Sequence, residues 1–275
     1  MGENVLNNLN ILLEKFFGTV ESEVFGLLDK LYRITPEILK EEPLKRFQVK
    51  DVNSNILLIL ISISILFIVF YLITYMLSMY NGYKQENIFK FVFKLAVFLI
   101  LSSSSMYIVE TVLDINNMFT EVILSIGKDV AKTEVSFEGL KECITDVEKH
   151  MSNDAVSVDG IIKGVVSLGA SSILITLSIR YVTAIVLVLL SPIAIMFAAS
   201  NNTYSLFLAW LKAFLINILT QNIIAVILII PLSIKETGEL MYKIVLVGSI
   251  YLLYKINTFT RELINISGGA NGRKS

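Results

Sequence analysis

The chain has 275 residues, of which 55% are hydrophobic and 17% are charged, and its formal net charge at pH 7 is −1. Soluble domains are typically about 45–50% apolar and about 25% charged, so the mean hydropathy of +0.71 excludes an ordinary soluble domain. The single cysteine, Cys143, excludes an internal disulfide framework, and the single histidine, His150, excludes a histidine-rich metal or catalytic centre. We expect an all-α, polytopic membrane protein with about five transmembrane helices.

Residues 1–54 are predicted to form an amphipathic helical N-terminal region. Up to residue 34, apolar side chains recur at intervals of three or four residues with acidic residues between them, which is typical of an amphipathic helix and not of a span. Thr35, Pro36 and Glu37 are typical of a helix start, as cap, first helical residue and acidic first turn. Two interpretations stay open: these helices lie on the membrane or dock on a partner, or they cover the protein's own bundle.

Residues 55–113 are predicted to hold the first two transmembrane helices. Residues 55–79 contain no charged side chain and are long enough to cross a bilayer, which needs about 20 apolar residues. Residues 91–113 are predicted to cross it again. Four serines, residues 102–105, lie in the middle of this second span, where small hydroxyl side chains either allow close helix packing or line a wet path.

Residues 114–160 are predicted to form a long acidic extracytoplasmic loop. This segment contains 10 Asp or Glu residues and 4 Lys residues. Within it, residues 134–151 carry apolar side chains on one helical face, so we expect a helix there.

Residues 161–260 are predicted to hold the C-terminal transmembrane helices around a central hairpin. No glycine, proline or asparagine lies near Arg180 to turn the chain, which favours one extended or kinked helix through it. Pro192 is predicted to break that helix, because proline has no N–H group and disfavours helical geometry in the residue before it. A polar turn at residues 201–203 is predicted to lead into a further span. The last span is predicted at residues 240–259.

Basic residues orient the predicted spans, because cytoplasmic loops of membrane proteins carry an excess of Lys and Arg. The connection between the first two spans and residues 261–275, a flexible basic tail, are placed in the cytoplasm. Residues 114–160 are acidic, and residues 1–54 carry 7 basic and 9 acidic side chains, so both are placed outside. These assignments predict a multi-pass protein of the cytoplasmic membrane with five spans, its N-terminus outside and its C-terminus in the cytoplasm.

The predicted spans carry few polar groups, and these are the candidate channel or helix-packing residues. Arg180 is strongly charged, and Pro192 breaks the helix that contains it. Asn217 and Gln221 lie at positions i and i+4 of the same span, so their amides share one helical face. Such amides bridge neighbouring helices or line a channel, and both interpretations stay open.

A candidate partner-docking ledge lies at the predicted cytoplasmic interface of the same hairpin. Phe207, Trp210 and Lys212 form this ledge, since tryptophan favours the depth of the membrane interface. The alternative is an interfacial anchor that binds no partner.

The sequence contains no arrangement of residues that is typical of catalysis, of a cofactor site or of a metal site. No pair of carboxylates lies inside a predicted span, and the HExxH, Walker and GxSxG motifs are absent from the sequence. We therefore expect no enzymatic activity and predict no catalytic, cofactor-binding or metal-binding residue.

The central hairpin combines several short features in a fixed order. An Arg-Tyr pair opens a long apolar helix, residues 190–194 (LSPIA) end it, a polar turn follows, and residues 207–212 (FLAWLK) precede the pair Asn217 and Gln221. This order resembles the TrbL-like family, the polytopic inner-membrane channel components of type IV secretion and conjugation machines.

The resemblance covers roughly residues 55–260. It implies a subunit that helps to form the translocation path for DNA or protein across the cytoplasmic membrane. The partners that it implies are secretion ATPases and other membrane subunits of the machine, the lipid bilayer and further copies of the chain, with nucleic acid only as translocated cargo. Two other functions stay open: a stand-alone transporter or permease, whose usual internal repeat is not visible in the sequence, and a non-conducting assembly protein of a membrane complex.

Overall fold

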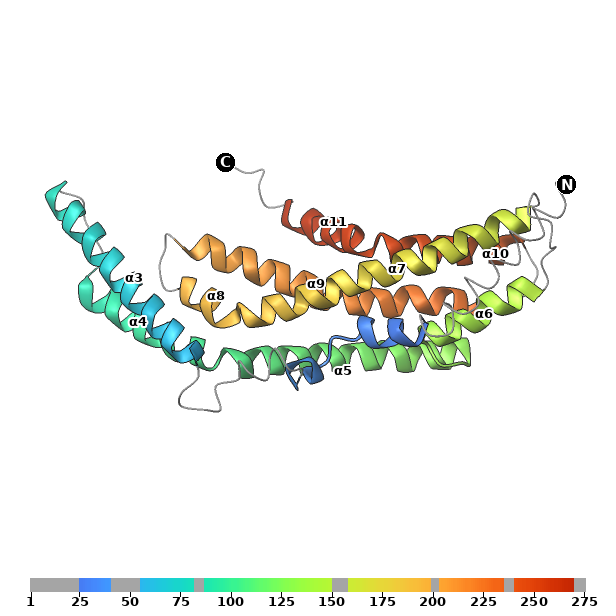
Figure 1. The fold of residues 1–275 in the computed structure, drawn as a ribbon, viewed down its shortest axis with the longest axis horizontal. Helices are drawn as coiled ribbons and strands as arrows, with labels where there is room; N and C mark the ends of the chain where they lie inside the picture. The colour runs from blue at the N-terminus through green and yellow to red at the C-terminus, as the bar shows by residue number, and fades with distance from the viewer. Residues whose placement is uncertain are drawn as a thin grey trace, which may run out of the picture. The chain divides into compact units, whose positions relative to one another are not determined.

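The structure is a computed structural model, and it describes residues 25–40, 55–81, 87–149, 158–198, 203–234 and 240–269. All regular elements within these ranges are helices, which confirms the all-α prediction (Figure 1). The chain divides into two compact units. The first unit contains the described parts of residues 1–34, 116–182 and 216–275, and the second unit contains those of residues 35–115 and 183–215.

Helices make up most of both units. Residues 25–32 are helical, and Pro36–Lys40 form a short 3-10 helix, η1, where the sequence predicts a helix start. A later helix, α6, confirms the helix predicted within residues 134–151. The bounds of the helices after η1 are α3 (Asn55–Tyr80), α4 (Ile88–Ser103), α5 (Ser105–Ala131), α6 (Phe137–Lys149), α7 (Val158–Leu189), α8 (Ser191–Phe197), α9 (Tyr204–Ser233), α10 (Leu240–Tyr254) and α11 (Ile256–Gly269).

Two helical segments are individually long and apolar enough to cross a membrane: Leu168–Leu189 of α7 and the whole of α9, Tyr204–Ser233. Two further pairs qualify only together, each bent at a short break: α4 with α5 by 58°, and α10 with Ile256–Leu263 by 76°. The described residues therefore hold two spanning helices, or up to four if each bent pair crosses once. The chain is a polytopic membrane protein, whereas the count of five spans, of which α3 would be the first, stays a prediction.

The helix predicted at residues 91–113 has different ends in the structure. It breaks at Ser104, and α5 then continues to Ala131, into the segment that was predicted to be an acidic loop. The reason is a stripe of buried side chains that continues at helical spacing through Asn116 and Thr120. The acidic residues of α5 lie on its exposed side. The loop prediction was wrong because it counted these acidic residues, whereas the chain forms an amphipathic helix.

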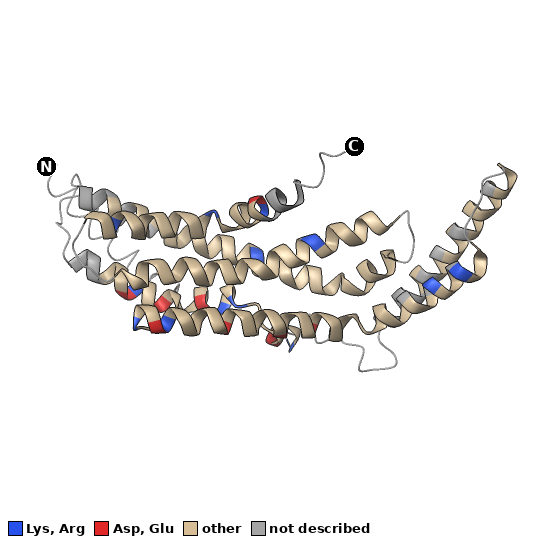
Figure 2. Cartoon of the chain, turned by 180° about the vertical axis from the view of Figure 1, so that it is seen from behind, with Lys and Arg blue, Asp and Glu red and all other residues tan. Residues whose placement is uncertain are grey.

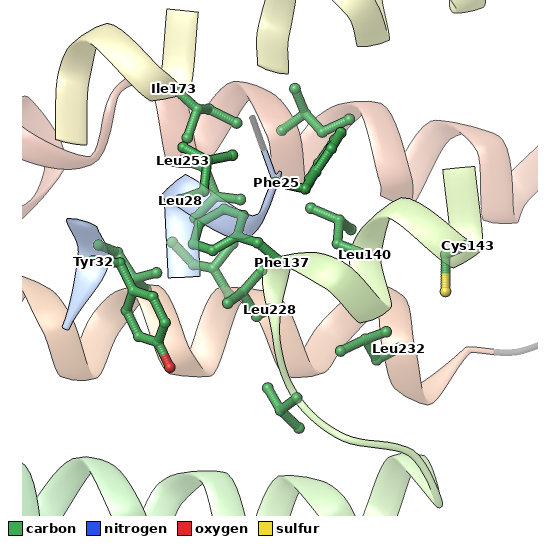
Figure 3. Packing of buried hydrophobic residues seen from close by; sticks show 14 of the residues in the cluster. Phe25, Leu28, Tyr32, Phe137, Leu140, Cys143, Ile173, Leu228, Leu232 and Leu253 are labelled. Atoms are coloured by element: carbon green, nitrogen blue, oxygen red, sulfur yellow. The ribbon is translucent and has the colours of Figure 1, made fainter. Parts of the chain in front are cut away.

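The core of the first unit joins the N-terminal helix to α6, α7, α9 and α10 (Figure 3). Phe25 and Tyr32 are buried in it, and the ring of Tyr32 meets that of Phe137 edge-on, with 5.6 Å between the ring centroids. Residues 25–34 therefore cover the protein's own bundle, which is one of the two interpretations that the sequence left open. Residues 1–24 lie outside the described residues.

The second unit contains α3, α4 and α8, with α4 packed against both of the others. Helix α7 runs without a break through Arg180 and ends at Leu189, which confirms one extended helix. Helix α8 then begins with Pro192 in its first turn, which confirms the predicted break. The buried hydroxyl of Ser102 on α4 donates a hydrogen bond to the carbonyl oxygen of Pro192, so this serine holds α4 against α8.

Thr203 closes the turn between α8 and α9 with its side chain. The hydroxyl of Thr203 donates a hydrogen bond of 2.7 Å to the carbonyl oxygen of Phe197, at the end of α8. Asn201 and Asn202, the other residues of the predicted turn, lie outside the described residues.

Candidate functional site

The sequence-predicted residues fall into two groups, one in each unit. The first unit contains Arg180, Asn217 and Gln221. The second unit contains Pro192, Phe207, Trp210 and Lys212.

Arg180 is buried in the first unit, with 2% of its surface exposed. Its guanidinium group donates two hydrogen bonds to the carbonyl oxygen of Asn217, from Nε at 3.1 Å and from Nη2 at 2.9 Å. The other terminal nitrogen, Nη1, donates to the carbonyl oxygen of Tyr32 at 2.8 Å. In return, the side-chain amide of Asn217 donates to the carbonyl oxygen of Arg180 at 3.3 Å. The rigid fork of arginine thus joins α7, α9 and the N-terminal segment at one point.

The burial of Arg180 needs a physical account, because the residue lies within the candidate span Leu168–Leu189. A basic residue at the centre of a spanning helix costs about 2.5–3.5 kcal/mol on insertion scales. Hydrogen bonds to carbonyl dipoles are stronger in a medium of low dielectric constant, and they offset part of that cost. Figure 2 shows how sparse the charged residues are along α7 and α9.

Gln221 is fully buried and connects α9 to two other segments. Its side-chain oxygen accepts a hydrogen bond from the backbone N–H of Ile34 at 2.8 Å, and its amide nitrogen donates to the hydroxyl oxygen of Thr120 at 3.0 Å. The side-chain nitrogen of Asn222 donates to the side-chain oxygen of Asn116 at 2.8 Å. Gln221 therefore bridges segments of the bundle, and with Asn222 it makes a polar contact between α5 and α9.

Two further contacts, at Asp29 and Arg33, hold the N-terminal segment through charged side chains. The Asp29 carboxylate accepts hydrogen bonds from the backbone N–H groups of Phe137 and Glu138, at 2.9 Å and 3.1 Å, where α6 begins. Burial raises the pKa of the Asp29 carboxyl group, and the two N–H donors offset part of that rise. The Asp29 carboxylate thus satisfies backbone donors that the first turn of α6 leaves unpaired. In the second contact, Arg33 forms an ion pair of 3.1 Å with Glu121 of α5.

We name residues 25–34 the N-terminal strap, because they bond to α5, α6, α7 and α9. The sequence did not indicate this role, since the carbonyl oxygen of Tyr32 and the N–H group of Ile34 belong to the backbone. The contributions of Asn116 and Thr120 had a signal, namely their helical spacing with apolar neighbours along α5.

Four aromatic side chains form a ladder along α9 in the second unit, beginning with Tyr204, whose ring centroid is 6.0 Å from that of Phe207. The ring centroids of Phe207 and Trp210 are 6.1 Å apart, and those of Trp210 and Phe214 are 5.3 Å apart. The indole N–H of Trp210 donates a hydrogen bond of 2.9 Å to the carbonyl oxygen of Leu187, near the end of α7. Phe207 and Trp210 of the predicted docking ledge are thus half-buried against their own chain, whereas Lys212 is exposed.

An apolar cavity of about 230 Å³ lies beside this ladder. Its lining includes Leu101 of α4, Val112 of α5, Ile195 of α8, and Trp210 and Leu215 of α9. All of the lining side chains are hydrocarbon except the indole, whose N–H is already bonded. Phe207 and Trp210 of the predicted ledge therefore form part of the cavity wall.

The chemistry of both groups is hydrogen bonding and packing. Within the described part of the chain, no group of three or more His, Cys, Asp or Glu side chains is placed to hold a metal ion. Cys143 is buried in the core of the first unit.

Comparison with known proteins identifies a family. The profile of the family described as TrbL/VirB6 plasmid conjugal transfer like protein matches residues 45–263, which is most of the chain. A search of curated proteins and a search of solved structures each give no match. The matched range contains Arg180 and the apolar cavity, whereas the N-terminal strap lies before it.

Proposed function

The chain belongs to the TrbL/VirB6 family of plasmid conjugal transfer proteins, and we propose that it is a membrane subunit of a type IV secretion machine. In this proposal it helps to form the path along which DNA crosses the cytoplasmic membrane. The observation that carries the proposal is the family match over residues 45–263, on a chain with uninterrupted apolar helices.

The buried polar contacts support a rigid part in that path. Arg180, Asn217 and Gln221 bond to their own chain, so they stabilise the packing of the bundle. Exposed apolar side chains along α7, among them Ile175 and Ile179, are left for lipid or for other helices. A rigid bundle with an apolar outside suits the wall of an assembly that several copies or subunits build together.

The proposed partners follow from the family to which the chain belongs. In this proposal secretion ATPases supply the energy, other membrane subunits and further copies of the chain complete the path, and nucleic acid passes as cargo. Its proposed place is the cytoplasmic membrane, which it crosses several times with the N-terminus outside and the C-terminus in the cytoplasm.

Gene deletion in the native host tests the proposal. Donor cells without this gene should transfer the conjugative element to recipients at a greatly reduced frequency, and a copy supplied in trans should restore it. Transfer at the wild-type frequency from the deletion strain would overturn the proposal and favour a stand-alone transporter.

The hydrogen bonds of Arg180 and Gln221 within their own chain are also compatible with a non-conducting assembly protein. A cross-linking experiment distinguishes such a protein from a subunit that forms the path. Donor cells are cross-linked during mating, the tagged chain is purified, and the transferred DNA strand is quantified. Recovery of that strand is the expected result. Intact assembly of the machine without recovered DNA would leave only the assembly function.

A further inference from the structure

The N-terminal strap reaches the middle of the candidate spans. Arg180, which donates to the carbonyl oxygen of Tyr32, lies 12 residues after the first residue of the span Leu168–Leu189 and nine before its last. The shorter of these distances is about 13 Å at about 1.5 Å per residue, close to half of a hydrocarbon core of about 30 Å. Gln221, which accepts a hydrogen bond from the N–H of Ile34, lies in the central part of α9. These backbone groups of the strap therefore lie near the middle of the membrane.

An ion pair lies at a similar depth and is open to its surroundings. Arg33 lies between the two bonded residues of the strap, and Glu121 directly follows Thr120, whose hydroxyl oxygen accepts a hydrogen bond from Gln221. The side chains of Arg33 and Glu121 are 38% and 53% exposed. Charged side chains at this depth face a bundle interior or a water-filled cavity, because hydrocarbon does not solvate them. The exposure of the pair excludes the bundle interior and indicates water on this side of the strap.

Helix α5 continues this polar surface along one of its sides, and charged side chains gather along this helix (Figure 2). Polar residues recur after Asn116 at intervals of four, four and three residues, so they share one helical face. They are Asn117, Glu121, Ser125 and Lys128. The adjoining exposed face is apolar and contains Phe119, Val122 and Ile126. Helix α5 thus has one exposed side that suits water and another that suits lipid.

We propose that this polar face of α5, together with Arg33, lines a water-filled cavity at the middle of the membrane, and that the cavity belongs to the path of the translocated cargo. The first part requires only that α7 and α9 cross the membrane, whereas the second part rests on the proposed function. One face of one helix cannot enclose a cavity, so further copies of the chain or other subunits supply the remaining walls.

The charges of this lining are paired with one another. Arg33 pairs with Glu121, and Lys128 pairs with Glu134 at 3.7 Å. Paired charges attract water but create no strong field of one sign. The lining therefore hydrates a passing cargo without holding it tightly.

Thiol reactivity in the native host tests the first part. In a Cys143→Ser background, Ser125→Cys places a thiol on the polar face, and Ile126→Cys places one on the apolar face at nearly the same depth. Both positions are exposed, so neither change disturbs the core. Intact cells and inside-out membrane vesicles are treated with a small, charged, membrane-impermeant thiol reagent, and the free thiol that remains on the tagged full-length chain is measured.

Ser125→Cys should react at least about tenfold faster than Ile126→Cys on one side of the membrane or the other, because a charged reagent is excluded from hydrocarbon. The pair Glu121→Cys and Val122→Cys should show the same difference. Slow reaction on both faces would overturn the proposal, since lipid or another protein would then cover the polar face. Equally fast reaction on both faces would also overturn it, because α5 would then lie in water outside the membrane.

Conjugal transfer from the same treated cells tests the second part. The reagent should abolish most transfer from Ser125→Cys donors, because it places a charged group in the path, and it should leave Ile126→Cys donors unaffected. Unchanged transfer from fully reacted Ser125→Cys donors would refute the place of the cavity in the path. Normal transfer from the deletion strain would refute the proposed function itself, and the difference in thiol reactivity between the two faces would still test the cavity.

Discussion

At the scale of single residues, Arg180 links three segments of the first unit. Its guanidinium nitrogens end on the backbone carbonyl oxygens of Tyr32 and Asn217, which belong to segments far apart in the sequence. A buried carbonyl group that loses its donor costs more than an average hydrogen bond contributes. The side chain therefore fixes the position of the N-terminal strap on α7 and α9.

Replacing Arg180 with alanine should lower the free energy of unfolding by about 1–3 kcal/mol, because the carbonyl oxygen of Tyr32 loses its donor. Arg180→Lys should have an intermediate effect, since an ammonium group cannot reproduce the planar fork. Ile179→Ala is the control, because Ile179 is 59% exposed and its truncation should change little. Thermal unfolding in mild detergent measures all three. Equal midpoints for Arg180→Ala and the wild type would contradict the role given to Arg180.

The Asp29 carboxyl group predicts a pH dependence of stability. Burial raises its pKa in the folded state above the ordinary value of 3.8. The stability that it contributes is therefore fully present below that ordinary value and is lost as the pH rises through the raised pKa. The stability of the wild type relative to Asp29→Asn, whose amide does not titrate, should increase as the pH falls from about 7 to about 4. Thermal midpoints across this range provide the comparison, and a relative stability that decreases on acidification would refute the prediction.

At the scale of elements, the contact between α5 and α9 depends on a glycine. A Cβ atom at Gly127 of α5 would lie 2.6 Å from Cδ1 of Ile229 and 2.9 Å from Cγ2 of Val135, closer than packed carbon atoms come. The missing side chain lets the two helices approach. The contact lies in the part of α5 that the sequence analysis assigned to a loop.

Two Gly→Ala substitutions separate this packing effect from helix propensity. Gly248→Ala on α10 meets no atom within 4 Å, so it should stabilise the protein by about 0.5–1 kcal/mol through helix propensity alone. Gly127→Ala has the same gain, but it must displace Ile229, and overpacking costs about 1–3 kcal/mol. Gly127→Ala should therefore unfold at a lower temperature than Gly248→Ala. The reverse order would show that α5 and α9 are not closely packed at Gly127.

The ends of a helix could be predicted from the sequence where helix-breaking residues alone determine them. The continuity of α7 through Arg180 and its end before Pro192 follow from where helix breakers occur. The extension of α5 to Ala131 was not predicted, because its many acidic residues were taken to indicate a loop and the helical spacing of its apolar residues was overlooked. The contact of Arg180 with Asn217 and Tyr32 could not be predicted from the sequence, since both acceptors of its guanidinium group are backbone carbonyl oxygens of distant segments.

The aromatic residues show the same limit. Trp210 was predicted at the membrane interface from its residue type alone. Its contact with the carbonyl oxygen of Leu187 and its place in a cavity wall depend on how α7, α8 and α9 pack, which no local pattern indicates.

At the scale of the whole molecule, the two units carry different chemistry. The first contains the bonded polar groups around Arg180 and Gln221 and the N-terminal strap, and the second contains the apolar cavity. Helices α5, α7 and α9 contribute residues to both units.

Thiol labelling tests the predicted orientation in the membrane. The native Cys143 is buried, so Cys143→Ser provides a background for introduced cysteines. Asn153→Cys should react with a membrane-impermeant reagent in intact cells, whereas Asn81→Cys should react only after permeabilisation, because acidic segments are placed outside and basic ones inside. The opposite pattern would invert the topology.

The most direct test of the central claim is a pull-down from the native cell. The chain carries an affinity tag, is extracted in a gentle detergent, and its associated proteins are identified by mass spectrometry. A subunit of a conjugal transfer machine should co-purify with a secretion ATPase and other membrane components. The Arg180→Ala variant should recover less of these partners than the wild type. A chain that purifies alone, or only with copies of itself, would contradict the account.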